Sequence, residues 1–536
     1  MVVSLIRAPR GIRILLPLSF FLTVLVLVGV YHNTGHATDL LNTITNKFEA
    51  QGHDDVQNNK EPSHDRPPSS HPLPKYKPTV TLAVPTITDP FPLLASSTGA
   101  PPPIPEYNVP KSGLHRDYGL GYMPPLFIGF TRQWPMLLQC VVSYLAAGWP
   151  PESIYVVENT GVHNANANGK LTLQNPFYLN HTTLRRLGVN VIQTPVLLTF
   201  SQLQNFFLST AASRSWPHYF YSHQDVLAFS FEDGPDTINR PGDREWFFYN
   251  DKEKMEAMRP AAARQPGYRT IYENCLREIN QTLASGERWA FRWFQYDHLT
   301  LVNREALEAV GGWDSLIPYY GSDCDMNARL EMDGWTMRNR RVGIINDVST
   351  VLEDLAGLYR DPKVIPSFFD PNPVLGVEDS KEPDQPDVVG DAPKKSNMTE
   401  GEEVGDDTGT ASESENEANI TEKRNADSLG QSPVVDANDP LDYFRTLLKV
   451  ADEMGEYKYR NRDLARNSWQ GSQHGGSGEP YYYNPDGFST SFWILAEAGR
   501  EVFSRKWGHR DCNLVEETAL KLGDQWLVEA DWEDAP

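Results

Sequence analysis

The chain has 536 residues, of which 40% are hydrophobic, and it carries a formal net charge of −23 at pH 7. This length exceeds the size at which a single hydrophobic core usually stops growing, so we expect more than one region. The negative charge excludes a general nucleic-acid-binding protein, because such proteins displace counterions from phosphates with clustered Lys and Arg side chains.

The N-terminus predicts a membrane anchor. Three arginines precede an uncharged apolar run at residues 14–31, and 18 residues in a helix would span about 27 Å, close to the thickness of a hydrocarbon core. A cleaved signal peptide is the alternative, but its apolar part is usually only about 7 to 15 residues long. We therefore expect a cytosolic tail at residues 1–13, a signal anchor at 14–31 and a lumenal remainder.

A stem is predicted after the anchor. Residues 32–118 are rich in Pro, Ser, Thr and His and lack a periodic apolar face, as expected of an extended, disordered segment. Four N-x-T acceptor sequences agree with a lumenal position; they lie at Asn180, Asn280, Asn397 and Asn419.

The cysteines do not indicate a zinc site, because they are widely spaced and form no C-x-x-C pair. Disulfides and buried free thiols are equally compatible with their positions, which are Cys140, Cys275, Cys324 and Cys512.

Residues 119–370 alternate between strand and helix patterns, which predicts βαβ units and a mostly parallel sheet that is covered on both faces. Strands are expected at residues 126–130, 153–161, 189–195 and 218–226. Helices are expected at residues 134–147 and 201–215, the second with Ser201 as its N-cap.

The strands end in polar residues that would meet at one edge of such a sheet, where ligands bind in open α/β folds. These endings are Thr131 and Arg132, then Glu158 to Thr160, then His223 to Asp225. Because side chains repeat every second residue along a strand, we expect His223 and Asp225 to project to the same side, as suits a divalent cation and a diphosphate. A strand that simply ends in polar residues at the surface is the alternative.

A later helix begins near Ser322. Ser322 and Asp325 have the spacing of a capping box, and Gly334 is placed to end the helix. Asp323 would then lie in the first turn, where the helix dipole favours the carboxylate form.

An acidic segment separates this region from the C-terminal part. Residues 371–440 contain 18 acidic and 5 basic side chains and few aromatic ones, which predicts a disordered insertion. Folded chain is expected to resume at residues 441–536 and to complete the preceding domain.

The order of these motifs resembles an inverting glycosyltransferase of the GT-A fold, close to the family-two type, over about residues 120–355. That family usually has D-x-D at the first motif and Glu-Asp at the second, in a frame like "GGFD...EDxDLxxR". This sequence departs at His223 and Ser322 and matches at four positions: Asp225, Asp323, Asp325 and Arg329.

The resemblance implies a nucleotide-diphospho-sugar transferase fold and transfer of a sugar from a UDP- or GDP-sugar to a glycan or glycoprotein acceptor. Asp323 would be the general base. Asp225 would hold Mn²⁺ or Mg²⁺ against the diphosphate, with His223 and His509 as further candidate ligands. The alternatives for His223 are a contact with the ribose and a polar residue that merely ends the strand, and the alternative for His509 is a structural histidine. The donor nucleotide would be bordered by Thr131, Arg132 and Glu158.

The anchor and stem resemble those of type II Golgi membrane enzymes. A lumenal, non-catalytic GT-A-fold binding protein is the competing hypothesis, motivated by His223 and Ser322. A retaining or phosphate-sugar transferase is a third possibility, which the position of Asp323 disfavours.

Overall fold

The computed structural model describes residues 74–78, 86–95, 98–234, 260–369, 439–460, 473–480 and 484–532. The chain divides into two units, Met1–Thr81 and Leu82–Pro536. Of the first unit only residues 74–78 are described, as an exposed segment without helix or strand. The predicted anchor at 14–31 and nearly all of the acidic segment lie outside the described residues. Among the described residues, no helix combines the length and the apolar character needed to cross a membrane.

The second unit is built around a seven-stranded mixed sheet with the order β3-β2-β1-β4-β7-β6-β8. Every neighbouring pair is parallel except the two that involve β7, which confirms the predicted mostly parallel α/β architecture. The strands are β1 (Leu126–Phe130), β2 (Ile154–Glu158), β3 (Asn190–Gln193), β4 (His218–Ser222), β6 (Trp289–Trp293), β7 (Leu299–Asn303) and β8 (Thr336–Asn339).

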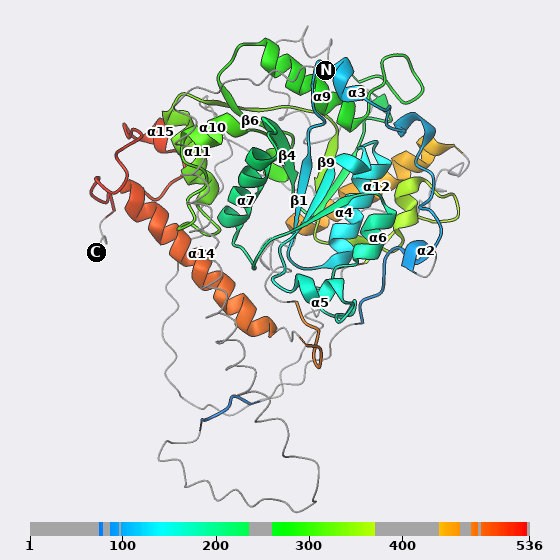
Figure 1. Cartoon of the computed structure of the whole chain (residues 1–536), viewed down its shortest axis with the longest axis horizontal. Helices are drawn as coiled ribbons and strands as arrows, with labels where there is room; N and C mark the ends of the chain where they lie inside the picture. Colours follow the sequence, from blue (N-terminus) through cyan, green and yellow to red (C-terminus); the bar gives the residue numbers. More distant parts are fainter. Residues whose placement is uncertain are drawn as a thin grey trace, which may run out of the picture. The chain divides into compact units, whose positions relative to one another are not determined.

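Helices cover both faces of this sheet (Figure 1). One face packs against α4 (Trp134–Ala146) and α9 (Ile271–Ala284), whose core α12 (Pro440–Arg460) joins, and the other against α7 (Phe200–Ser213), α10 (Arg304–Ala309) and α11 (Ser322–Met332). The short apolar run of β1 is almost wholly buried between these layers, because a central parallel strand is covered on both sides. Shorter helices are α2 (Pro92–Ala95), α3 (Leu114–Asp117), α5 (His163–Ala167), α6 (His181–Arg186) and α15 (Leu514–Glu517).

The predicted fourth strand is interrupted. β4 ends at Ser222, the chain turns at residues 223–225, and β5 (Val226–Phe229) pairs antiparallel with β9 (Ile344–Asp347) in a separate two-stranded sheet. A further small pair is formed by β10 (Val351–Leu352) and β11 (Phe368–Phe369). The expectation that His223 and Asp225 alternate along one strand was therefore wrong.

Two predicted helix caps were also wrong. The N-cap of α7 is Thr199, whose backbone N–H donates to Gln202 Oε1 at 3.0 Å. The N-cap of α11 is Gly321 in the left-handed conformation (φ 84°), and the hydroxyl of Ser322 donates instead to the carbonyl of Tyr319. Glycine adopts this left-handed conformation without a steric penalty, so Gly321 can precede the helix where a residue with a side chain would be strained.

Packed chain begins earlier than the predicted end of the stem at residue 118. Phe91 and Leu94 are 0% and 1% exposed and belong to the core that contains β1 and α4. Leu114, on α3, is buried in the same core. These apolar residues lie at irregular intervals among prolines, so no helical or strand period revealed them.

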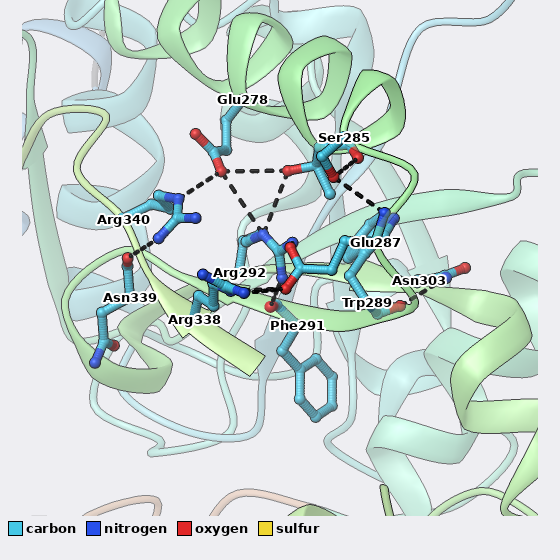
Figure 2. Close-up of polar contacts among 11 residues, drawn as sticks. Glu278, Ser285, Glu287, Trp289, Phe291, Arg292, Asn303, Arg338, Asn339 and Arg340 are labelled. Atoms are coloured by element: carbon cyan, nitrogen blue, oxygen red, sulfur yellow. Dashed lines mark hydrogen bonds and ion pairs between the residues drawn. The ribbon is translucent and has the colours of Figure 1, made fainter. Parts of the chain in front are cut away.

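A buried ion-pair network joins α9 to the far end of the sheet. Figure 2 shows Arg292 of β6 between Glu278 and Glu287, with its nitrogen atoms 3.7 Å and 2.7 Å from their carboxylates. Arg340 pairs with Glu278 at 3.0 Å, and Arg338 pairs with Glu287 at 2.6 Å. Arg292 is 1% exposed, so this charge is tolerated in the interior only because both carboxylates neutralise it.

The C-terminal part packs onto α11. The long helix α14 (Pro485–Trp507) runs along the flank of the domain (Figure 1), and its residues Phe503 and Trp507 are buried with Ile317. A disulfide joins Cys324 to Cys512, whereas Cys140 and Cys275 are buried free thiols.

Candidate functional site

The carboxyl ends of β1, β2 and β4 meet at one edge of the sheet, as predicted. The side chain of Gln224 accepts from the backbone N–H of Thr131 at 3.4 Å and donates to the carbonyl of Arg132 at 2.6 Å. Asn159, which follows Glu158, donates to the hydroxyl of Thr131 at 3.3 Å. The structure thus brings together the three strand endings that the sequence indicated.

Glu158 is fully buried at this edge, and its two carboxylate oxygens bind groups of the protein itself. Oε1 accepts from Thr160 and Asn166, and Oε2 lies 2.9 Å from the imidazole of His181 and 3.2 Å from the amide of Gln193. Burial would raise the pKa of Glu158, but these hydrogen bonds outweigh it and lower the pKa. The carboxylate has little capacity left for a ribose hydroxyl in this arrangement and instead holds the surrounding loops together.

Asp225 lies in the turn after β4, where it binds an ammonium group from far along the chain. Lys458 Nζ of α12 is 2.9 Å from Asp225 and 2.5 Å from Asp347 at the end of β9. All three residues are at least nine-tenths buried. Burial opposes the charged form of each partner, but the ion pair outweighs it, so the pKa of Asp225 is lowered and that of Lys458 is raised.

The turn at residues 295–298 completes the site. Gln295 and Tyr296 both adopt the left-handed conformation, with φ of 77° and 48°. Such a conformation costs a residue with a side chain of the order of 1 kcal/mol, and it is typical of functional segments that the surrounding structure holds in place. The turn directs Asp297 to His223, with 3.4 Å between Oδ2 and Nε2, and His298 to Asp347 at 3.5 Å.

The charge on His223 follows from this environment. Burial alone would lower the pKa of His223, but the carboxylates of Asp297, Asp225 and Asp347 outweigh it and raise the pKa to about 9. The same pairing lowers the pKa of Asp297 to about 2 against the effect of burial. His223 is therefore an imidazolium at neutral pH.

Asp323 lies in the first turn of α11, as predicted, and faces the same turn. Its Oδ2 accepts a hydrogen bond of 3.2 Å from the phenol of Tyr296, whose side chain is 45% exposed. Burial and the neighbouring charge of Asp297 raise the pKa of Asp323, and the N–H of Cys324 and the phenol offset only part of that effect. We expected the helix terminus to favour the carboxylate form of Asp323, but the net effect of its surroundings is a raised pKa.

Asp325 has a structural role but is not a cap. It is fully buried, and its Oδ2 pairs with Arg329 at 2.8 Å. Its Oδ1 accepts from the indole of Trp507 at 3.0 Å and lies 2.7 Å from Lys506 Nζ. The carboxylate thereby ties α11 to the C-terminal end of α14.

His509 lies in a different cluster. Its imidazole contacts Asp531 and lies 3.5 Å from Glu517, and no described contact joins it to Asp225 or His223. One ligand atom each from His509, Asp511 and Glu517 lies within 4.8 Å of the others. Asp511 and Glu517 are exposed, and exposed carboxylates often cluster without an ion.

The residues around Asp225 do not fit the divalent cation that the resemblance implies. Lys458 already supplies the counter-charge of Asp225, the imidazole of His223 lies against Asp297, and His509 lies elsewhere. Among the described residues, the one place where three side chains able to bind a metal ion come together is the cluster of His509, Asp511 and Glu517.

Four residues of the site were missed from the sequence. Tyr296 and Asp297 follow β6 just as His223 follows β4, so the rule that polar residues at strand ends mark a ligand edge applied to them too. Asp347 likewise ends β9. Lys458 continues the buried stripe of α12 through Phe444, Leu447, Ala451 and Met454, and a lysine on such a face needs a buried partner.

No protein-family model matches this sequence, and no curated protein sequence does. Among solved structures, the chain is similar to the mannosyltransferase PcManGT from Pyrobaculum calidifontis, solved in complex with GDP-Man and Mn²⁺. The identity is 11%, the TM-score is 0.23, and the match covers 42% of this chain and 60% of that one. It is also similar to a cytidylyltransferase from Leptospira borgpetersenii serovar Hardjo-bovis (strain JB197), with 12% identity, a TM-score of 0.21 and coverage of 40% and 75%.

Proposed function

We propose that this chain is an inverting glycosyltransferase that moves a sugar from a UDP- or GDP-sugar to a glycan or glycoprotein acceptor. The observation that carries the proposal is the position of Asp323. Its carboxylate is hydrogen-bonded to Tyr296, in the turn that also contacts His223 at the ligand edge of the sheet. The edge where a nucleotide-sugar would bind and a basic carboxylate are thus adjacent.

Asp323 has the properties of a general base for this reaction. Inversion requires the acceptor hydroxyl to attack the anomeric carbon from the side opposite the nucleotide, and that hydroxyl becomes nucleophilic as its proton leaves. A raised pKa increases the proton affinity of the Asp323 carboxylate. The side chain stays ionised, and can accept a proton, as long as the pH exceeds that pKa. The half-exposed Tyr296 holds the carboxylate in place and borders the space where an acceptor would lie.

The donor would lie along the ends of β1 and β4. Thr131 and Arg132 follow β1, and the guanidinium of Arg132 stacks over the ring of Phe488 at 4.1 Å, which holds it at this edge. The imidazolium of His223 supplies positive charge towards the diphosphate. We assign Glu158 a positioning role, through the loops that its carboxylate joins.

The cellular setting is proposed from the sequence. The apolar run at 14–31 and the acceptor sequences support a single-pass type II Golgi membrane protein with its catalytic part in the lumen.

The test is a screen of the purified full chain against UDP- and GDP-sugars, with measurement of donor binding, donor hydrolysis and transfer to glycan acceptors. We expect binding of one nucleotide-sugar class and slow hydrolysis without acceptor. Binding without hydrolysis or transfer would favour the non-catalytic binding protein. That hypothesis is motivated by His223 and Ser322, which stand where the resembled family usually has acidic residues. No binding of any nucleotide-sugar would contradict both hypotheses.

A further inference from the structure

The ammonium of Lys458 occupies a position that the sequence order does not suggest. It lies near the end of α12, on the far side of the acidic segment, and yet it contacts the turn after β4. Its side chain is only 2% exposed and has two carboxylate partners, Asp225 and Asp347. Both carboxylates lie within hydrogen-bond distance of one nitrogen atom, so a single cation serves both of them.

We propose that Lys458 replaces a divalent cation as the counter-charge of Asp225, so that donor binding at this edge of the sheet requires no metal ion. The inference about donor binding rests on the proposed function. The inference about metal binding at Asp225 does not, because it concerns only the ion pairs of the chain itself.

Displacement of the ammonium is the first physical reason. A metal ion bound by Asp225 and Asp347 would have to expel Lys458, which would leave a buried charge without its partners. The cost of breaking a buried ion pair in this way corresponds to a loss of affinity of about 150- to 5,000-fold. A divalent ion therefore binds poorly here unless the lysine is removed.

The local charge gives the second reason. The resembled family usually has aspartates at both outer positions of the D-x-D motif. Here the first position is His223, which carries no negative charge, so one carboxylate fewer needs to be balanced. A single ammonium between Asp225 and Asp347 leaves one net negative charge, and the imidazole of His298 lies 3.5 Å from Asp347 on that side.

The role of Lys458 is positional, because its nitrogen contacts carboxylates of the protein. It joins the turn after β4 to the end of β9 and to α12, and so fixes the backbone that carries His223. A metal ion in the same place would also hold these segments together, but it would require a more regular arrangement of ligands.

The test compares Mn²⁺ binding by the full chain, stripped with EDTA, in the wild type and three variants. Lys458→Met removes the ammonium with little change of volume and frees both carboxylates, so we expect this variant to gain Mn²⁺ affinity by about 100-fold or more over the wild type. Lys458→Arg keeps the charge and should gain none. Adding Asp347→Asn to Lys458→Met should abolish the gain. Mn²⁺ binding is read by electron paramagnetic resonance, and Asp511→Asn in every form removes any background from the cluster at His509.

Donor binding is measured in parallel. We expect the wild-type affinity for the nucleotide-sugar found in the screen to be equal within about twofold with EDTA and with Mn²⁺. Wild-type protein that binds Mn²⁺ tightly, and loses it on Asp225→Asn, would overturn the inference, as would donor binding abolished by EDTA. If Lys458→Met does not fold, the wild type and Asp225→Asn decide the matter. If no nucleotide-sugar binds at all, the proposed function fails while the Mn²⁺ titrations still test the role of Lys458.

Discussion

Two aspartates of α11 lie only two residues apart, and we expect replacement by asparagine to lower the stability of the fold at one of them and to leave it almost unchanged at the other. Asp325 is fully buried, and its two oxygens bind Arg329, Lys506 and the indole of Trp507. Asp323 accepts one side-chain hydrogen bond, from Tyr296. Replacement of each by asparagine keeps the shape and removes the charge, so the pair compares a structural carboxylate with the one that we propose as the general base.

The magnitude for Asp325→Asn follows from its partners. Asparagine has one acceptor oxygen, so either Arg329 or the pair Lys506 and Trp507 would face its NH₂ group and lose an acceptor. Breaking a buried ion pair from one side typically costs about 3–5 kcal/mol. At about 2 °C per kcal/mol for a large domain, Tm should fall by about 6–10 °C.

The assay is thermal unfolding of both variants, followed by circular dichroism, with urea unfolding as a second measure. Asp323→Asn serves as the matched control and should change stability by less than about 1 kcal/mol, because the asparagine oxygen can still accept the hydrogen bond from Tyr296 and the substitution relieves repulsion from Asp297. A Tm for Asp325→Asn within about 2 °C of the wild type would refute the reasoning, and so would equal losses in both variants.

Two further predictions concern the stability of the same unit. Burial, with a smaller effect of Arg304, lowers the pKa of His218 from 6.5 to about 4. The neutral form is favoured in the folded state, so stability present above pH 6.5 should be lost as the pH falls towards 4, by about 3 kcal/mol in urea unfolding; an identical pH profile for His218→Gln would contradict this. The disulfide between Cys324 and Cys512 closes a sequence separation of 188 residues. Its reduction should cost about 2–5 kcal/mol, and a Cys324→Ser/Cys512→Ser variant should no longer respond to reductant.

The sequence predicted the sheet well because its central strands have strong local signals. The runs at 126–130 and 153–161 are apolar and bounded by turns, and both proved to contain strands. The run at 218–226 was predicted as one strand because apolar residues lie on both sides of His223. The chain turns there because its two halves pair with different partners, β7 and β9, which lie far along the chain.

The site was predicted in part for the same reason. Strand endings and a first-turn aspartate are local features, so Thr131, Asp225 and Asp323 were identified. The partners of these residues come from other elements: Tyr296 from the turn after β6, and Lys458 from a helix beyond the acidic segment. No local pattern links such residues, and only the fold brings their charges together.

The cap assigned to Asp325 failed through the same kind of distant contact. A carboxylate three residues after a serine has the spacing of a capping box, but Lys506 and Trp507 compete for it from α14. Gly321 then starts the helix with a left-handed turn. The spacing of a capping box therefore does not predict a cap where buried side chains from another helix bind the carboxylate instead.

The most direct test of the proposed function is the turnover of Asp323→Asn with the nucleotide-sugar and acceptor identified in the screen. General bases typically contribute about 100- to 10,000-fold to a rate. We therefore predict a fall in kcat of that size, with donor Kd and Tm nearly unchanged, because the variant keeps the fold and the donor edge. Turnover within about threefold of the wild type would contradict the assignment of Asp323 as the base.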